Sequence, residues 1–244
     1  MINCASLLGN SCVKFQQQDH LVYMMLTKES DTKFLSNLKM HDNIVYVSEE
    51  PSLCPVQGCC LAVTTGYGYS QLDLKVQLVL KTIKDFFPSF ISLSKMDDDA
   101  YLDYYAFESV KRNLTTHSYV GKFKSGPCSK SNVDFAGGSF YVLGRSVIEC
   151  LLSDYRTCGS GYEDRSIALS VYRNCDKYER IDLTPMMNVD LFHKVYASKD
   201  KLLYLDNKDP ESASHLMPNH GEAFELKPPS LDISDQKNKT SPHA

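Results

Sequence analysis

Short strand-like segments alternate with helix-like segments along this chain, and residues 72–96 show the alternation most clearly. Apolar residues recur at intervals of three and four over 72–87, which predicts an amphipathic helix ended by Pro88. Residues 90–96 then alternate apolar and polar side chains, as a half-buried strand does. Helices and strands that alternate in this way favour an α/β fold with a mixed, mostly parallel sheet flanked by helices.

The remaining sequence extends this alternation on both sides. We predict strands over 20–27, 43–47, 118–123 and 135–143, and helices over 34–38, 100–111, 147–155 and 162–172. Residues 51–69 contain prolines, glycines and paired cysteines without a clear period, which predicts an irregular loop.

Length and charge narrow the possible classes of protein. The 244 residues, 43% hydrophobic and 23% charged, suit one globular domain, which we expect over residues 1–208. The polar remainder, 209–244, is expected to be a disordered tail. The formal net charge of -4 gives no general attraction to phosphate backbones, so nucleic acid is not an expected partner.

The chain has no apolar run near the roughly 20 residues of a membrane-spanning helix, and its first residues lack the pattern of a secretory signal. We therefore expect no membrane span and a cytoplasmic protein. The alternative is the Golgi lumen, if the chain is a fragment of a longer protein.

The nine cysteines show no two C-x-x-C pairs of zinc-ribbon type. Without an export signal, this predicts reduced thiols, several of them buried as small apolar residues. In an oxidising compartment a disulfide within the group Cys128, Cys150, Cys158 and Cys175 is an alternative. Asn113 and Asn238 would then head glycosylation sequons.

Asp97, Asp98 and Asp99 place three carboxylates at the carboxyl end of the predicted strand 90–96. Adjacent like charges repel, so the folded chain needs a cation or hydrogen-bond donors beside them. Carboxylate oxygens suit Mn²⁺ or Mg²⁺, which keep coordination positions open for substrate phosphates. The cluster is therefore a candidate metal and diphosphate site. The alternative is a solvated acidic turn in which Asp99 caps the following helix.

Gly137 and Gly138 lie inside the predicted strand 135–143. A glycine pair within a strand indicates either a packing bulge or a place where a ligand approaches the backbone closely.

Residues 160–164 introduce the last predicted helix. Ser160 and Glu163 have the spacing of a capping box, which gives Glu163 a structural role. Asp164 either stabilises the helix dipole or acts as a general base that takes a proton from an acceptor hydroxyl. A helix N-terminus lowers the pKa of a carboxyl group. A base at Asp164 therefore needs a second negative group or partial burial to raise its pKa again.

The histidines and isolated basic residues carry less information. His193 lies in a strand-like segment and is either a packed or surface residue or a metal ligand. His215 and His220 are weaker ligand candidates. Lys95 and Arg145 could contact phosphate, but nothing in the sequence separates them from surface charges.

Four motifs occur in one order: residues 95–102 (Lys-Met-Asp-Asp-Asp-Ala-Tyr-Leu), 135–143 (Phe-Ala-Gly-Gly-Ser-Phe-Tyr-Val-Leu), 161–164 (Gly-Tyr-Glu-Asp) and 191–193 (Leu-Phe-His). By order and context they resemble the fringe and β1,3-galactosyltransferase-like group of GT-A fold glycosyltransferases. The resemblance extends over residues 21–205 and implies the Rossmann-like GT-A fold for the predicted sheet.

The resemblance also implies an activity. It is the transfer of a hexose or N-acetylhexosamine, with inversion, from a UDP-sugar to a hydroxyl of a glycan or glycoprotein acceptor. The residues that match the motifs of the group would be Asp99 and His193 as ligands of Mn²⁺ or Mg²⁺, Asp97, Asp98, Gly137 and Gly138 as donor contacts, and Asp164 as catalytic base.

Two other functions stay open. A chain of the same fold could bind nucleotide sugar or glycan without turnover, since few residues precede Leu21 to complete a nucleobase pocket. A metal-dependent phosphatase or nucleotidyltransferase would also use clustered aspartates. It would need a second carboxylate near the first strand, where Asp19 stands alone.

Overall fold

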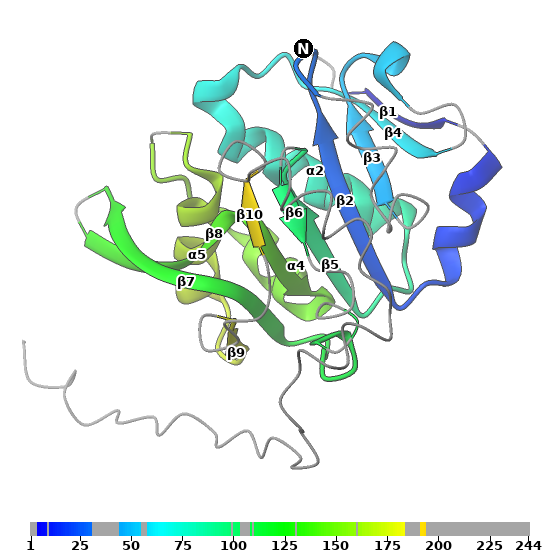
Figure 1. The fold of residues 1–244 in the computed structure, drawn as a ribbon. Helices are drawn as coiled ribbons and strands as arrows, with labels where there is room; N and C mark the ends of the chain where they lie inside the picture. The colour runs from blue at the N-terminus through cyan, green and yellow to red at the C-terminus, as the bar shows by residue number, and fades with distance from the viewer. Residues whose placement is uncertain are drawn as a thin grey trace, which may run out of the picture. The chain divides into compact units, whose positions relative to one another are not determined.

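The structure is a computed structural model, and it describes residues 4–8, 10–30, 44–54, 58–98, 100–102, 108, 110–129, 131–159, 161–183 and 191–193. These residues form an α/β fold with an eight-stranded sheet, a second sheet of two strands, and the helices α2, α4 and α5 (Figure 1). The mixed sheet flanked by helices that the sequence predicts is therefore confirmed.

The strands are β1 (Cys4–Leu8), β2 (His20–Leu26), β3 (Ile44–Ser48), β4 (Cys59–Thr64), β5 (Ser92–Met96), β6 (Ala100–Leu102), β7 (Ser118–Cys128), β8 (Ser131–Gly144), β9 (Glu179–Asp182) and β10 (Leu191–His193). The helices are α2 (Leu72–Phe86), α4 (Arg145–Ser153) and α5 (Glu163–Asn174), with the 3-10 turns η1 (Asn10–Gln17), η3 (Pro51–Leu53) and η4 (Tyr69–Gln71).

The large sheet has the strand order β1-β4-β3-β2-β5-β8-β7-β9. Its centre is parallel, because β4, β3, β2 and β5 pair in the same direction. On one side β5 pairs antiparallel with β8, and β8 with β7. The four parallel strands have the relative order 3-2-1-4 of a Rossmann half, so the winding of the chain reverses between β2 and β5.

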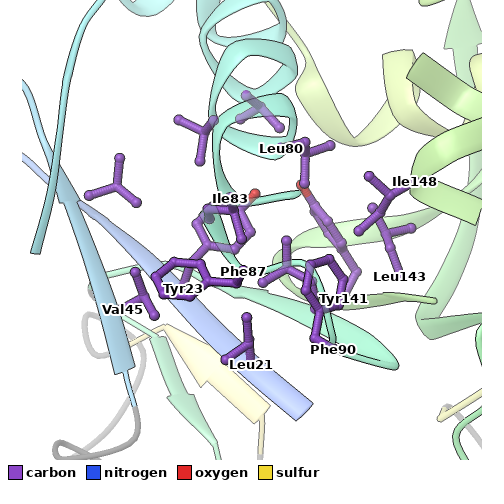
Figure 2. Close-up of a cluster of buried hydrophobic side chains, with 14 of the residues drawn as sticks. Leu21, Tyr23, Val45, Leu80, Ile83, Phe87, Phe90, Tyr141, Leu143 and Ile148 are labelled. Carbon is purple, nitrogen blue, oxygen red and sulfur yellow. The ribbon is translucent and has the colours of Figure 1, made fainter. Parts of the chain in front are cut away.

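Helices cover one face of this sheet, and a second apolar layer covers the other. Successive residues of a strand point to opposite faces, so Leu21 and Tyr23 pack under the helices while Val22 and Met24 lie in the second layer. Figure 2 shows Leu80 and Ile83 of α2 above Tyr23, with Tyr141 of β8 beside them.

Because both faces are covered, β5 is buried throughout, and the half-buried strand predicted from its alternation is wrong in this respect. Its polar residues Ser92, Ser94 and Lys95 are buried as well, with Lys95 only 2% exposed. Burial of a lysine requires charged partners, which the site described below supplies.

The prediction of an irregular loop over 51–69 is also wrong, because β4 lies within it. Cys59 and Cys60 occupy opposite faces of this strand and are buried in the two apolar layers, so its apolar pattern depends partly on cysteines. The predicted helix over 100–111 is wrong at its start. Residues 100–102 form β6, which pairs with β10, and pairing overrides local propensity here.

Eight of the nine cysteines form disulfides, so the prediction of reduced thiols is wrong. The pairs are Cys12–Cys59, Cys54–Cys60, Cys128–Cys158 and Cys150–Cys175, with Cα–Cα distances of 4.5, 5.8, 4.9 and 5.5 Å. All four distances lie in the range of disulfide-bonded residues. The sequence alone could not supply the pairings because they join residues brought together by the sheet and α5.

The predicted helix 34–38, the tail 209–244, Asp99, Ser160, His215 and His220 lie outside the described residues. Within the described residues, no helix combines the length and the apolar character that a membrane crossing needs.

Candidate active site

The acidic turn lies where the winding of the sheet reverses. The carboxyl ends of β2, β3, β4 and β5 meet at one edge of the sheet, and ligands of such sheets bind in the crevice at the reversal point. Ser30, which follows β2, donates a hydrogen bond to a carboxylate oxygen of Asp98, which follows β5. This bond joins the segments that follow β2 and β5, at the reversal point.

A bulge in β8 brings the glycine pair to the same place. Gly121 of β7 pairs with Tyr141, but Phe123 pairs with Ala136, so residues 137–140 of β8 have only Lys122 opposite them on β7. The Asp97 amide donates to the Ser139 carbonyl over 3.0 Å. The bulge predicted at the glycine pair is thus present, and it approaches the acidic turn.

Lys95 joins three parts of the site. Its ammonium group donates to a carboxylate oxygen of Asp97 and to the carbonyl of Gly138, and it lies 3.2 Å from the carboxylate of Glu163. Burial alone would lower the pKa of Lys95, but the carboxylates of Glu163 and Asp97 outweigh burial and raise it. Lys95 is therefore a permanent cation that links β5, the bulge in β8 and the start of α5.

No sequence feature separates Lys95 from a surface lysine, and the structure shows it to be buried. Arg145 lies elsewhere. Its amide donates to the Ile91 carbonyl at the amino end of β5, at the opposite edge of the sheet from Asp97. Arg145 is therefore not part of this site.

Glu163 and Asp164 begin α5. The predicted capping box is wrong, because the N-cap is Tyr162 without a side-chain cap bond, and Glu163 is buried beside Lys95. A Cβ atom added to Gly138 would lie 2.8 Å from the carboxylate of Glu163 and 3.6 Å from that of Asp164. Only a glycine therefore leaves this space free above the two carboxylates.

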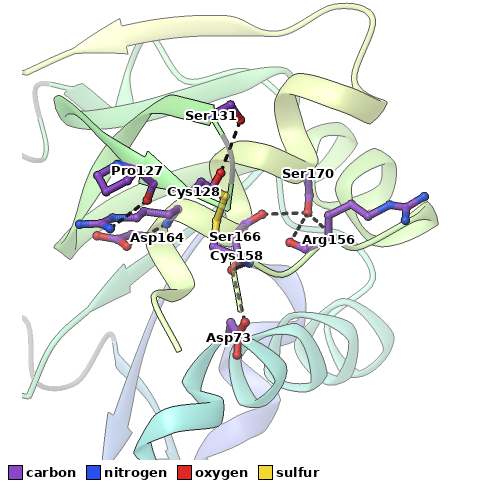
Figure 3. The surroundings of a disulfide bond; sticks show 10 residues. Asp73, Pro127, Cys128, Ser131, Arg156, Cys158, Asp164, Ser166 and Ser170 are labelled. Carbon is purple, nitrogen blue, oxygen red and sulfur yellow. Dashed lines mark hydrogen bonds between the residues drawn. A yellow bond between two sulfur atoms is a disulfide. The ribbon is translucent and has the colours of Figure 1, made fainter. Parts of the chain in front are cut away.

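The loop that leads into α5 is bonded to the first turns of this helix (Figure 3). The Cys158 amide donates to Ser166 over 2.9 Å, and the Arg156 amide donates to Ser170 over 2.8 Å. The disulfide Cys128–Cys158 ties this loop to the end of β7. These bonds fix the first turn of α5 against the hairpin of β7 and β8.

The environment of Asp164 raises its pKa. Burial is the largest cause, the neighbouring carboxylate of Glu163 is the second, and the Arg165 amide, Lys124 and Lys95 partly oppose them. Partial burial and a second negative group are the two conditions that a base at a helix N-terminus needs. Asp164 thus has a raised proton affinity, which suits a general base.

The predicted metal ligands are placed only in part. The backbone of His193 in β10 pairs with Ala100 in β6, the residue that follows the acidic triplet. In the part of the chain that the structure describes, no three His, Cys, Asp or Glu side chains gather as a metal site would require. Asp99 lies outside that part, so the pair of Asp99 and His193 stays a prediction.

Comparison with known proteins gives matches in structure only. No family model and no curated protein sequence matches the chain. It is similar to a glycosyltransferase involved in the glycosylation of the major capsid of PBCV-1, with 12% identity, 77% of this chain and 98% of that chain covered, and a TM-score of 0.44. A second similar structure is A197 from STIV, with 10% identity, 71% and 84% coverage and a TM-score of 0.43.

A third similar structure is a cytidylyltransferase from Leptospira borgpetersenii serovar Hardjo-bovis, with 15% identity, 68% and 75% coverage and a TM-score of 0.40. These similarities do not assign the chain to a family.

Proposed function

We propose that the protein is a metal-dependent glycosyltransferase that moves a hexose or N-acetylhexosamine from a UDP-sugar to an acceptor hydroxyl, with inversion. One observation carries the proposal. Lys95 bonds to Asp97, to the Gly138 carbonyl and to Glu163, so the acidic turn and the start of α5 converge on one ammonium group although they are far apart in sequence.

The acidic turn would bind the donor. Asp98 is already oriented by Ser30, and Asp97 by Lys95, so both carboxylates are fixed before a ligand arrives. Fixed groups lose little conformational entropy on binding. Gly137 and Gly138 would lie beside the donor sugar, because these two residues have no side chains to exclude a sugar ring there.

Asp99 and His193 would hold Mn²⁺ or Mg²⁺. Two observations fit such a site. His193 pairs with Ala100, which follows the triplet, and Asp97 is ion-paired with Lys95, so the metal ligands would come from other residues. The bound cation would neutralise negative charge on the leaving diphosphate.

Asp164 would take the proton of the acceptor hydroxyl as that oxygen attacks the anomeric carbon. Inversion by direct displacement requires the base and the leaving diphosphate on opposite sides of this carbon. The Gly138 bulge separates Asp164 from the acidic turn, and a donor sugar placed along it would have one carboxylate group on each side.

The test is a panel of nucleotide sugars with Mn²⁺, assayed for release of free nucleotide. Asp99→Ala and Asp164→Ala should both lose turnover, by on the order of a hundredfold or more for the base. Only Asp99→Ala should also weaken metal-dependent donor binding. Equal donor affinity in wild type and Asp99→Ala contradicts the metal role. Donor binding without release of nucleotide would favour the binding module instead.

A further inference from the structure

A cavity of about 480 Å³ lies along the flank of α5, between this helix and the strands β7, β8 and β9. None of its lining residues has a role in the site described above. Its volume is typical of small-molecule pockets, which range over about 300–1,000 Å³. We refer to this cavity as the α5 groove.

Aromatic rings form much of the α5 groove. Tyr119 makes an edge contact with Phe123 at 5.0 Å between ring centroids, and its ring lies 6.3 Å from that of Tyr178. Tyr172 on α5 is 67% exposed and Tyr178 is 37% exposed. Aromatic side chains that are open to solvent beside a cavity offer an apolar face on which a ligand can pack.

Positively and negatively charged side chains lie beside the aromatic rings. The guanidinium of Arg180 stacks 4.0 Å from the centroid of Phe123 and donates to Asp134 over 3.1 Å. The hydroxyl of Tyr178 has its pKa raised by burial, lowered in part by Arg180, and raised by Tyr172 and Asp134. Side chains from α5, β8 and β9 therefore meet around Tyr178. Asn132 and Arg173 also line the groove.

The inner end of the α5 groove borders the candidate base. Asp164, Ala168 and Tyr172 are four residues apart on α5 and so share one face of the helix. Ala168, a groove residue, is about one turn (a rise of about 6 Å) from Asp164. Tyr119 accepts a hydrogen bond over 3.2 Å from the Ala136 amide, next to the glycine pair, and its pKa is raised by burial and by Asp164.

We propose that the α5 groove binds the saccharide of the acceptor, which deepens the glycosyltransferase proposal and rests on it. A sugar ring presents apolar C–H faces that pack on aromatic rings, and hydroxyls that both donate and accept hydrogen bonds. The groove offers exposed rings together with the paired Arg180 and Asp134, whose donors and acceptors suit hydroxyls. Asp134 offsets the charge of Arg180, which leaves Arg173 as the one other charged residue of the lining, so a neutral saccharide is a better fit than a diphosphate.

The test measures saccharide binding without donor or metal, on an array of immobilised glycans. Wild type should bind a subset of the array. Tyr172→Ala and Tyr178→Ala should each weaken that binding on the order of tenfold, the usual loss when an aromatic anchor is truncated. Both side chains are exposed, so neither change should unfold the chain. Tyr69→Ala is the matched control, because this tyrosine is 88% exposed and lies outside the groove.

Further measurements separate this proposal from the glycosyltransferase proposal. Asp164→Asn should keep glycan binding, and UDP with Mn²⁺ should bind equally well to wild type and Tyr172→Ala. Glycan binding without transfer would leave the groove in place and reject the enzyme. Absence of glycan binding by wild type, or unchanged binding by both tyrosine variants, would overturn the groove proposal even if donor hydrolysis is observed.

Discussion

Lys95 carries a positive charge in a place where water cannot solvate it, so its position depends on the carboxylates around it. Glu163 is 8% exposed at the side chain and lies 3.2 Å away, while Asp97 is more open to solvent. Removing one partner of a buried pair leaves the other charge without compensation. This costs about 3–5 kcal/mol. We therefore expect Lys95→Met to be strongly destabilised and Lys95→Met/Glu163→Gln to recover part of the loss in urea unfolding.

The same charges should set the pH dependence of turnover. Asp164 must be deprotonated to act as base, and its raised pKa means that activity falls as the pH drops through that value. Lys95 lowers this pKa and Glu163 raises it. Glu163→Gln should therefore move the acidic limb of kcat/KM to lower pH, and the double variant with Lys95→Met should move it back upward. If adding Lys95→Met to Glu163→Gln moved the acidic limb further to lower pH, the assignment of Asp164 as the base would be contradicted.

Gly138 offers a second test at single-residue scale. An alanine Cβ there would lie 2.8 Å from the carboxylate of Glu163, closer than real contacts allow, so the Glu163 and Lys95 side chains must move apart. We expect Gly138→Ala to lose turnover at least tenfold and about 1–3 kcal/mol of stability, as overpacking does. Gly68→Ala is the control, because its added Cβ meets nothing within 4 Å. Equal turnover in the two variants would show that the space above Glu163 is not needed.

Motifs located some of these residues and missed others for a physical reason. Asp97, Gly138 and Asp164 stand in local patterns, so the sequence could single them out, although it does not establish their roles. Lys95 and Glu163 are 68 residues apart, and their ion pair exists only because β5 and α5 pack on β8. No local pattern reports that contact, and the capping-box spacing pointed Glu163 to a different role.

At the scale of elements, the disulfides Cys128–Cys158 and Cys150–Cys175 form a natural comparison. They close loops of similar length, 30 and 25 residues, so each should stabilise the chain by about 3–4 kcal/mol. Of these two disulfides, Cys128–Cys158 is the one that holds the loop leading to Glu163 and Asp164. The double replacement Cys128→Ser/Cys158→Ser should therefore lower both the melting temperature and turnover, measured at a temperature where the variant is folded.

Cys150→Ser/Cys175→Ser should lower the melting temperature by a similar amount but keep turnover per folded molecule, because it joins α4 to the far end of α5. Loss of turnover in both variants would mean that α5 acts as one rigid unit and that the loop has no special role.

Elements were predicted well where burial follows a period and poorly elsewhere. The helix over 72–87 has a continuous apolar face and appears as α2. The strand β4 was missed because its cysteines and proline-rich surroundings suggest a loop, while β6 and β9 are short strands that depend on their partners β10 and β7. The direction of pairing between β5 and β8 likewise comes from the packing of the whole sheet.

At the scale of the whole molecule, the four disulfides fall into two groups on either side of the acidic turn. Cys12–Cys59 and Cys54–Cys60 stabilise the strands before β5, and the other two stabilise the hairpin and helices after it. No disulfide joins the two groups, so their connection depends on the pairing of β2, β5 and β8 and on the bonds of Lys95. The candidate site lies at this junction, where strand pairing and one buried ion pair position both sets of carboxylates.

This arrangement predicts how the chain responds to reductant. Nine cysteines and four disulfides leave one thiol, so alkylation in denaturant should label one cysteine per chain before reduction and nine after it. Disulfides persist in oxidising conditions and are lost to reductant. Full reduction should lower the melting temperature by at least about 15 °C, since each disulfide contributes about 2–4 kcal/mol. The contrary result would be nine labelled thiols before reduction, together with a melting temperature that reductant does not change. It would show that these cysteines act only as small apolar side chains.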